Sequence, residues 1–264
     1  MTEPRTYPEG VPSWIDLEQP DLEATRRFYS ALFGWSIPDD DRPYFVATLD
    51  GQDVAGLSAG ESDRGWLSHI AVDDAETASI RVVQAGGTLL EAPEGGNPAG
   101  RSAICADPQG AVFGLWQAGF RIGAQAVNVP GGWNFSDLHT PDTDAALAFY
   151  AEVFGWQVDP DLGAGMIRLP GYGDHLASTA DPDIHERQSF APPGFADVVA
   201  GITPDDGPAR WVIRFAVADR DATAALAERL GGTVSSSSED EWTREADVTD
   251  PQGARFIVSQ FMVS

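Results

Sequence analysis

The chain has 264 residues, of which 42% are hydrophobic, and a formal net charge of −25 from 41 acidic and 16 basic residues. A surface of this sign repels nucleic acid and anionic membranes, so we expect neither as a partner. The N-terminus lacks the apolar stretch of a signal peptide, and no run of 18 apolar residues follows. We therefore expect a cytoplasmic protein, either a monomer or a homodimer, with its single cysteine, Cys105, in the core.

The hydrophobic pattern predicts a strand, a helix and a hairpin in the first part of the chain. The strand covers residues 13–18, where apolar and polar side chains alternate. The helix follows the N-cap candidate Asp21 and ends at Gly34, a residue type that favours helix ends. The hairpin joins strands at 44–49 and 54–59.

The same order of elements returns in the next part of the chain. A strand at 67–72 precedes a helix from about 75 to 85, and strands near 103–106 and 111–117 close the segment. Each part is interpreted as a βαβββ module. The pattern therefore predicts an α+β fold.

A repeat of domain length sets the organisation of the chain. The segment 20–35 returns as 141–156, so that Asp142 lies 121 residues after Asp21, and the Asp-Pro-Gln-Gly turn at Asp107 returns at Asp250. We expect two domains of two modules each. The first, at 1–120, has a short N-terminal arm, a glycine-rich linker covers 121–132, and the second, at 133–264, carries an insertion within 171–210.

These repeated motifs resemble the glyoxalase/bleomycin-resistance/extradiol-dioxygenase superfamily, also called vicinal oxygen chelate (VOC), in its tandem actinobacterial form. The Pro-Asp-x-x-x-x-x-x-Phe-Tyr helix and the Asp-Pro-x-Gly-x-x-Phe turn occur in order, twice, and span nearly the whole chain. The resemblance implies that each domain pairs two modules into an incomplete barrel that forms a cup around a small molecule. It also implies metal ligands, usually His, Glu or Gln, on the first and last strands of the modules.

The positions that correspond to these ligands hold no side chain able to bind a divalent ion. They are Trp14, Leu67, Gly114, Phe135, Val212 and Ile257. Metal sites need His, Cys or carboxylate side chains at such positions. We therefore expect neither a metal nor another cofactor.

Residues two positions further along the same strands should face the same cup, because side chains alternate along a strand. They form two acid–base combinations, Asp16 with His69 in the first domain and Asp137 with Arg214 in the second. The second pair is interpreted as a structural ion pair. Asp16 and His69 are either the same device or candidate catalytic residues, with Asp16 orienting His69 as acid or base. A displaced metal site that includes Glu18 is the remaining alternative.

Aromatic and polar residues on or beside the strands suggest a flat, partly apolar ligand. The candidate ligand-binding residues are Trp14, Glu18, Trp66, Leu67, Phe113, Trp116, Phe135, Asp137, His139, Trp211 and Arg214. Three functions stay open. The first is metal-independent binding or sequestration of a small molecule, and the second is a metal-free lyase, isomerase, hydrolase or cyclase. The third is a glyoxalase-like lyase or extradiol dioxygenase with a displaced metal site.

Overall fold

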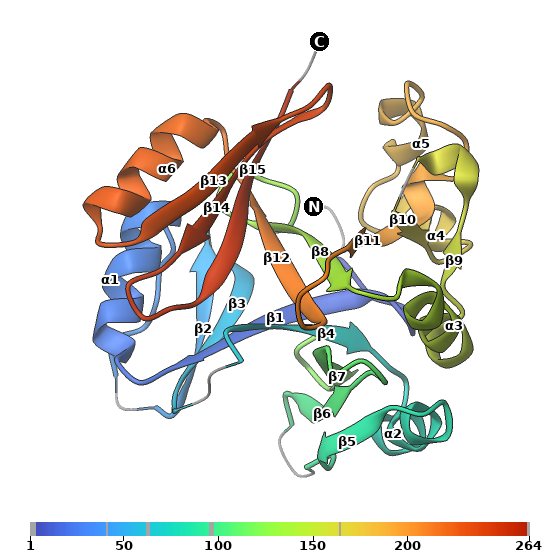
Figure 1. The fold of residues 1–264 in the computed structure, drawn as a ribbon. Coiled ribbons are helices and arrows are strands. Elements are labelled where there is room, and N and C mark those ends of the chain that lie inside the picture. The colour runs from blue at the N-terminus through green and yellow to red at the C-terminus, as the bar shows by residue number, and fades with distance from the viewer. Residues whose placement is uncertain (1–3, 41, 62–63, 95–97, 164, 263–264) are drawn as a thin grey trace. The chain divides into compact units, whose positions relative to one another are not determined.

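The structure, a computed structural model, describes residues 4–40, 42–61, 64–94, 98–163 and 165–262. Within these ranges no helix is long and apolar enough to cross a membrane. The first repeat contains β1 (Pro12–Gln19), α1 (Leu22–Phe33), β2 (Tyr44–Leu49), β3 (Gln52–Ala59), β4 (Trp66–Ala71), α2 (Ala75–Gln84), β5 (Thr88–Glu91), β6 (Gly100–Ala106) and β7 (Val112–Ala118) (Figure 1).

The second repeat follows the same order with additional elements in its first module. Its strands and main helices are β8 (Trp133–Thr140), α3 (Thr143–Phe154), β9 (Gln157–Val158), β10 (Met166–Arg168), β11 (Val198–Pro204), β12 (Arg210–Ala216), α6 (Arg220–Arg229), β13 (Thr233–Glu239), β14 (Thr243–Thr249) and β15 (Arg255–Phe261). The additional elements are β9, whose counterpart in the first repeat is an isolated bridge between Ser36 and Thr48, α4 (Tyr172–Ser178), α5 (Ile184–Arg187) and the 3-10 turns η1 (Pro160–Leu162) and η2 (Phe195–Asp197).

Local chemistry fixes both ends of the repeated helix. The Asp21 side chain accepts a hydrogen bond from the Ala24 N–H of α1, at 2.9 Å, and Asp142 caps α3 in the same way. Both helices end at a glycine in the left-handed conformation, with φ of 76° at Gly34 and 73° at Gly155. Other residues rarely adopt such φ values, so the two glycines terminate the helices as predicted.

Each module pairs its first strand in parallel with its last strand. β1 pairs with β3, β4 with β7, β8 with β11, and β12 with β15. The remaining strands join antiparallel, giving the runs β2-β3, β5-β6-β7, β9-β10-β11 and β13-β14-β15. The sheets are mixed and open in the described part of the chain, which confirms the predicted α+β fold with incomplete barrels.

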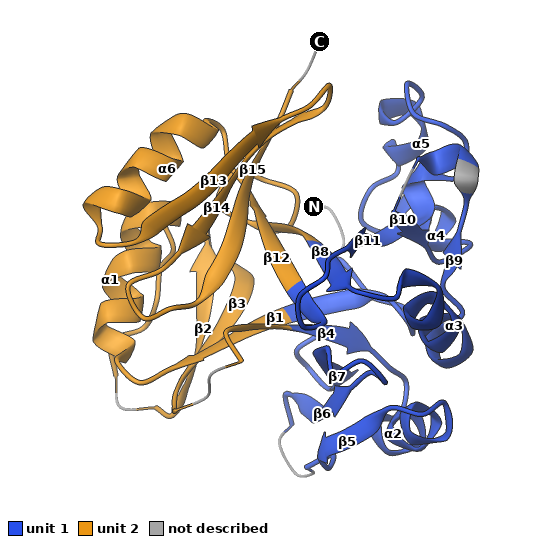
Figure 2. Ribbon diagram, viewed as in Figure 1, with its two compact units in different colours: residues 1–14, 68–123, 136–211 blue, residues 15–67, 124–135, 212–264 orange. Residues whose placement is uncertain are grey.

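The chain forms two compact units, and each unit takes one module from each repeat (Figure 2). Unit 1 contains residues 1–14, 68–123 and 136–211, and unit 2 contains residues 15–67, 124–135 and 212–264. The chain passes between the units within β1, β4, β8 and β12, and once more after Gly123, in the connection from β7 to β8. The division into domains at 1–120 and 133–264 follows the sequence repeat and stays a prediction.

An aromatic cluster fills the core of unit 2. Tyr29 of α1 stacks on Trp35, with ring centroids 5.5 Å apart, and its hydroxyl accepts a hydrogen bond from Trp66 Nε1 at 3.1 Å. Phe215 and Phe256 from the second repeat pack against the same rings. The core therefore joins modules that are far apart in the sequence.

Unit 1 contains the matching cluster. Tyr150 of α3 stacks on Trp156 at 5.0 Å and accepts a hydrogen bond from Trp211 Nε1 at 3.0 Å. Phe113 and Phe154 complete the contacts around the Tyr150 ring. The motif helices thus build both cores with the same chemistry.

A buried carboxylate connects the two repeated motifs inside unit 2. Asp250, from the Asp-Pro-Gln-Gly turn, accepts hydrogen bonds from Gln19 Nε2 (2.6 Å), the Tyr29 hydroxyl (2.9 Å) and the Gln252 and Ala254 N–H groups (2.9 Å each). It is 5% exposed. The four donors satisfy a carboxylate that would otherwise be costly to bury.

In unit 1, Asp107 repeats this arrangement with three donors. Its carboxylate accepts hydrogen bonds from the Gln109 and Ala111 N–H groups, at 2.9 Å each, and from the Tyr150 hydroxyl at 3.3 Å. Burial raises the pKa of Asp107 above its usual value. In both units, a tyrosine from the motif helix of one repeat therefore donates a hydrogen bond to the Asp-Pro-Gln-Gly turn of the other repeat.

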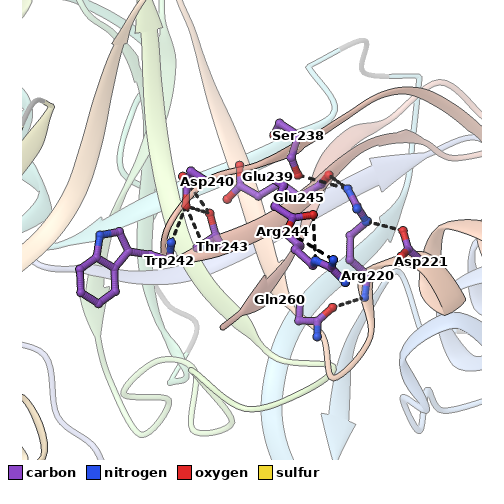
Figure 3. Close-up of polar contacts among 10 residues, drawn as sticks. All are labelled: Arg220, Asp221, Ser238, Glu239, Asp240, Trp242, Thr243, Arg244, Glu245 and Gln260. Carbon is purple, nitrogen blue, oxygen red and sulfur yellow. Dashed lines mark hydrogen bonds and ion pairs between the residues drawn. The ribbon is translucent and has the colours of Figure 1, made fainter. Parts of the chain in front are cut away.

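A buried arginine anchors the start of α6 (Figure 3). The Arg220 guanidinium donates to the Asp221 carboxylate at 2.7 Å and to the main-chain oxygens of Ser238 and Glu245, at 3.2 and 2.6 Å. The main-chain N–H of Arg220 donates to the Gln260 side-chain oxygen at 2.9 Å. These contacts tie the helix to β13, β14 and β15 and give Arg220 a structural role.

Candidate functional site

The predicted site residues occupy equivalent positions on the first strands of the four modules. We call the strand face that carries them the cup face. Opposite each residue, on the last strand of the same module, the partners are Gly56 for Asp16, Gly114 for His69, Gly201 for Asp137 and Ile257 for Arg214. Three of these four side chains thus lie beside a glycine, which leaves them room on the strand surface.

His69 fills the space that Gly114 leaves open in unit 1. A Cβ atom at Gly114 would overlap the imidazole ring, and His69 itself is only 2% exposed. Gly114 is one of the six positions that correspond to metal ligands in the superfamily but hold no metal-binding side chain here. The structure explains why this position is a glycine, because a larger side chain there would displace His69.

Asp16 is held by a tyrosine in unit 2. The Tyr44 hydroxyl of β2 donates to Asp16 Oδ1 at 2.6 Å, above the space left by Gly56. Glu18, two residues further on, lies over Gly60 in a similar way. A hydrogen bond of this length fixes the orientation of the Asp16 carboxyl group.

Arg214 forms its contacts in unit 2 with the last strands of the same module. Its guanidinium pairs with the Glu245 carboxylate of β14, and Ser259 Oγ donates to the same carboxylate at 3.0 Å. Both charged side chains are less than one-fifth exposed. Glu245 was not among the predicted site residues, because its place beside Arg214 depends on strand register.

A further polar group lies at the ends of β8 and β11 in unit 1. His139 Nδ1 is 3.3 Å from Asp205 Oδ2, and Arg210 Nη2 donates to the same oxygen at 2.7 Å. The sequence predicted His139 as a ligand contact but did not indicate Asp205 or Arg210. A comparison of β3 with β11 would have found both, since Gly60 and Gly65 of the first repeat correspond to them.

The two predicted pairs each combine residues from different units. Asp16 belongs to unit 2 and His69 to unit 1, and Asp137 belongs to unit 1 and Arg214 to unit 2. Both pairings stay predictions. Within the units, the structure adds Tyr44 as a partner for Asp16 and Glu245 for Arg214.

Three of the predicted ligand contacts lie in the aromatic cores. Trp66 and Trp211 donate to the tyrosine hydroxyls described above, and Phe113 is fully buried against α3. On β4, β7 and β12 these residues alternate with the cup-face positions, so their side chains point to the opposite face. Their predicted contact with a ligand is corrected to a role in core packing.

Trp14 and Trp116 have a different environment in unit 1. The Arg121 guanidinium lies 6.0 Å from the Trp14 ring centroid, and Trp116 Nε1 donates to the Arg121 main-chain oxygen at 3.0 Å. Trp14 is buried, whereas Trp116 is half-buried. Leu67 and Phe135 occupy cup-face positions by strand alternation. Ligand contact at these residues stays a prediction.

The residues present do not fit the metal site that the fold suggests. The six positions that correspond to metal ligands hold aromatic, aliphatic or glycine residues. Two residues further along the first strands, the possible ligands are Asp16 and His69 in one repeat and Asp137 in the other. Among the described residues, no group of three or more His, Cys, Asp or Glu side chains is placed to hold a metal ion. A protein site for such an ion needs at least three of these ligands.

Comparisons with known proteins agree with the repeat and the fold. The family model of the Glyoxalase-like domain matches residues 14–116 and 135–259. CFP32 of Mycobacterium tuberculosis, provisionally named a glyoxylase, is 35% identical over 265 residues, which cover 96% of this chain and 95% of that protein. The anthracycline biosynthesis protein DnrV of Streptomyces peucetius is 32% identical over 274 residues, which cover 96% and 94%.

Solved structures show the likeness of fold at lower identity. The Mn(II)-bound glyoxalase from Novosphingobium aromaticivorans has a TM-score of 0.63 at 15% identity, covering 96% of this chain and 82% of that one. The 2,3-dioxygenase LapB from Pseudomonas sp. KL28 has a TM-score of 0.60 at 15% identity, covering 98% and 96%. The chain therefore belongs to the Glyoxalase-like family, with one matched segment in each repeat.

Proposed function

We propose that this protein binds a small, partly aromatic molecule in its cups without a metal ion. The observation that carries the proposal is the chemistry of the ligand positions, where Trp14, Phe135 and four other residues offer no donor to a divalent ion. Gly114 supports it further, because the His69 ring lies over this position. A binding or sequestering protein of this kind needs shape and apolar surface rather than a Lewis acid.

The relatives suggest which molecules to test first. DnrV and the related DauV of Streptomyces are named for anthracycline biosynthesis, and an anthracycline is a flat, fused-ring aromatic compound. The acidic surface of this chain would attract a ligand that also carries a positive charge. The expected partner is thus a small molecule, with neither nucleic acid nor a membrane as partner and the protein itself a monomer or homodimer.

A metal-free enzyme is the second candidate function. Its support is that Asp16 is fixed by Tyr44 and that His69 has a dedicated space beside Gly114. In such an enzyme Asp16 and His69 would move a proton to or from the bound molecule. A glyoxalase-like lyase or an extradiol dioxygenase with a displaced metal site has less support, because no group of three or more His, Cys, Asp or Glu side chains among the described residues is placed to hold a metal ion.

Metal analysis of the purified protein and ligand titration test the proposal together. We expect less than one-tenth of an equivalent of Zn, Ni, Mn or Fe per chain, and saturable quenching of the fluorescence of daunorubicin, an anthracycline, in the same sample. One tightly held metal ion per chain would contradict the proposal. His69→Ala then separates the two candidates, with the exposed His185→Ala as control. A binder leaves its ligand unchanged in every variant, whereas an enzyme loses turnover only in His69→Ala.

A further inference from the structure

The group formed by His139, Asp205 and Arg210 has a geometry that the proposed function does not use. Asp205 lies just after β11, and its Oδ2 atom contacts two side chains. It accepts a hydrogen bond from Arg210 Nη2 at 2.7 Å and lies 3.3 Å from His139 Nδ1. Its other oxygen accepts the Gly207 N–H at 2.7 Å. Asp205 Oδ2 thus connects a histidine on the cup face of β8 to a permanent cation.

The first repeat has nothing equivalent to this group. The positions that correspond to His139, Asp205 and Arg210 are Glu18, Gly60 and Gly65. There the Glu18 side chain occupies the space over Gly60. The second repeat therefore differs at three positions that come together in space, and each difference contributes one member of a histidine–carboxylate–arginine group.

The partners of Asp205 determine where the imidazole carries its proton. The Arg210 hydrogen bond, followed by those of Gly207 and His139, holds the pKa of Asp205 well below its usual range. An ionised carboxylate can only accept hydrogen bonds, so Nδ1 of the neutral ring must donate to it. The lone pair is then on Nε2, as in other histidines that are oriented by a carboxylate.

Nε2 of His139 is the atom that needs a partner. It is buried, and it has no hydrogen-bond partner among the described residues, although the side chain as a whole is 16% exposed. Buried polar atoms in native proteins nearly always have a partner, so such an atom points to a ligand or a bound water. As an acceptor, it requires a group that donates a hydrogen bond.

We propose that His139 is a ligand-binding residue whose Nε2 accepts a hydrogen bond from the hydroxyl group of a phenolic molecule. Asp205 is its positioning residue, and Arg210 keeps Asp205 ionised. The inference rests on the proposed function in one respect, namely that the second repeat binds a small aromatic molecule. A phenolic hydroxyl is the donor that an aromatic ligand most directly supplies to a basic nitrogen.

The tautomer of His139 provides the first test and needs no ligand. Long-range nitrogen–proton NMR spectra at mildly alkaline pH distinguish the Nδ1–H from the Nε2–H form, and His139→Phe identifies the signals among the four histidines. We expect the Nδ1–H form in the wild-type protein and a smaller Nδ1–H fraction in Asp205→Ala. The exposed neighbour Asp206→Ala should leave it unchanged. An Nε2–H form in the wild type, or no response to Asp205→Ala, would overturn the assignment.

Paired probes provide the second test. Naphthalen-2-ol and its methyl ether differ by one hydroxyl proton, so the ratio of their affinities isolates the hydrogen bond. We expect the naphthol to bind about tenfold more tightly than the ether, the effect of one hydrogen bond, with the preference lost in His139→Phe and retained in His185→Phe. Equal binding of the two probes to the wild type, a preference that survives in His139→Phe, or no binding of either probe would overturn the inference. None of these outcomes depends on metal content, which tests the proposed function separately.

Discussion

Removal of the Asp250 carboxylate should destabilise the protein more than removal of its counterpart Asp107. Asp250→Ala removes an acceptor of four hydrogen bonds and leaves Gln19, Tyr29 and two main-chain N–H groups with one partner fewer. At about 1 kcal/mol for each bond, the loss is about 4 kcal/mol in the free energy of unfolding. Asp107→Ala removes three bonds, so we expect about 3 kcal/mol.

Urea denaturation followed by tryptophan fluorescence measures these losses, because Trp66 and Trp211 contact the same tyrosines. A double-mutant cycle with Tyr29→Phe then isolates one bond. We expect a coupling of about 1 kcal/mol between Tyr29→Phe and Asp250→Ala, since the Tyr29 hydroxyl donates to that carboxylate. The exposed Asp247→Ala should change stability by less than about 0.5 kcal/mol. Additive effects at Tyr29 and Asp250, or a loss at Asp250 no larger than at Asp247, would refute the reasoning.

Two further predictions concern His69 and the single cysteine. Gly114→Ala should lower the free energy of unfolding by about 1–3 kcal/mol, because the added Cβ overlaps the His69 ring. Most of that loss should disappear in the His69→Ala background. An equal loss in both backgrounds would show that the ring is not the cause. Burial raises the pKa of the Cys105 thiol to about 12, so at pH 8 about one molecule in ten thousand carries a thiolate. Ellman's reagent should therefore react with Cys105 only in urea, and rapid reaction of one equivalent in the native protein would contradict its burial.

The parts of the fold that follow from local chemistry could be predicted from the sequence. Asp21 and Gly34 define the ends of α1 because a cap and a left-handed glycine act within a few residues. The short strand β5 was not located, because its residues are mostly exposed and show no clear alternation. The bond between Tyr29 and Asp250 could not be predicted either, because it joins residues 221 positions apart.

The site was harder to predict than the fold. Strand alternation placed Asp16 and His69 on one strand face, and their role in a site stays a prediction. Trp66, Phe113 and Trp211 were assigned to the cup because aromatic content alone does not indicate a strand face. Asp205 and Arg210 were missed because Asp205 directly follows the end of β11 and Arg210 begins β12, at the edge of the segment that was interpreted as an insertion. The register of β8 with β11 brings Asp205 near His139, and Arg210 joins them through its hydrogen bond to Asp205.

Each unit is built from one module of each repeat, and this bears on how a duplicated chain can diverge. A single-repeat ancestor would have completed its aromatic cores only by exchanging halves with a second identical chain, and fusion made that association intramolecular. Once covalently joined, the two halves were always produced in equal amounts and no longer had to be identical. The two copies could then differ at single positions, as they do where one has Asp205 and Arg210 and the other has glycine, which two identical chains could not have done.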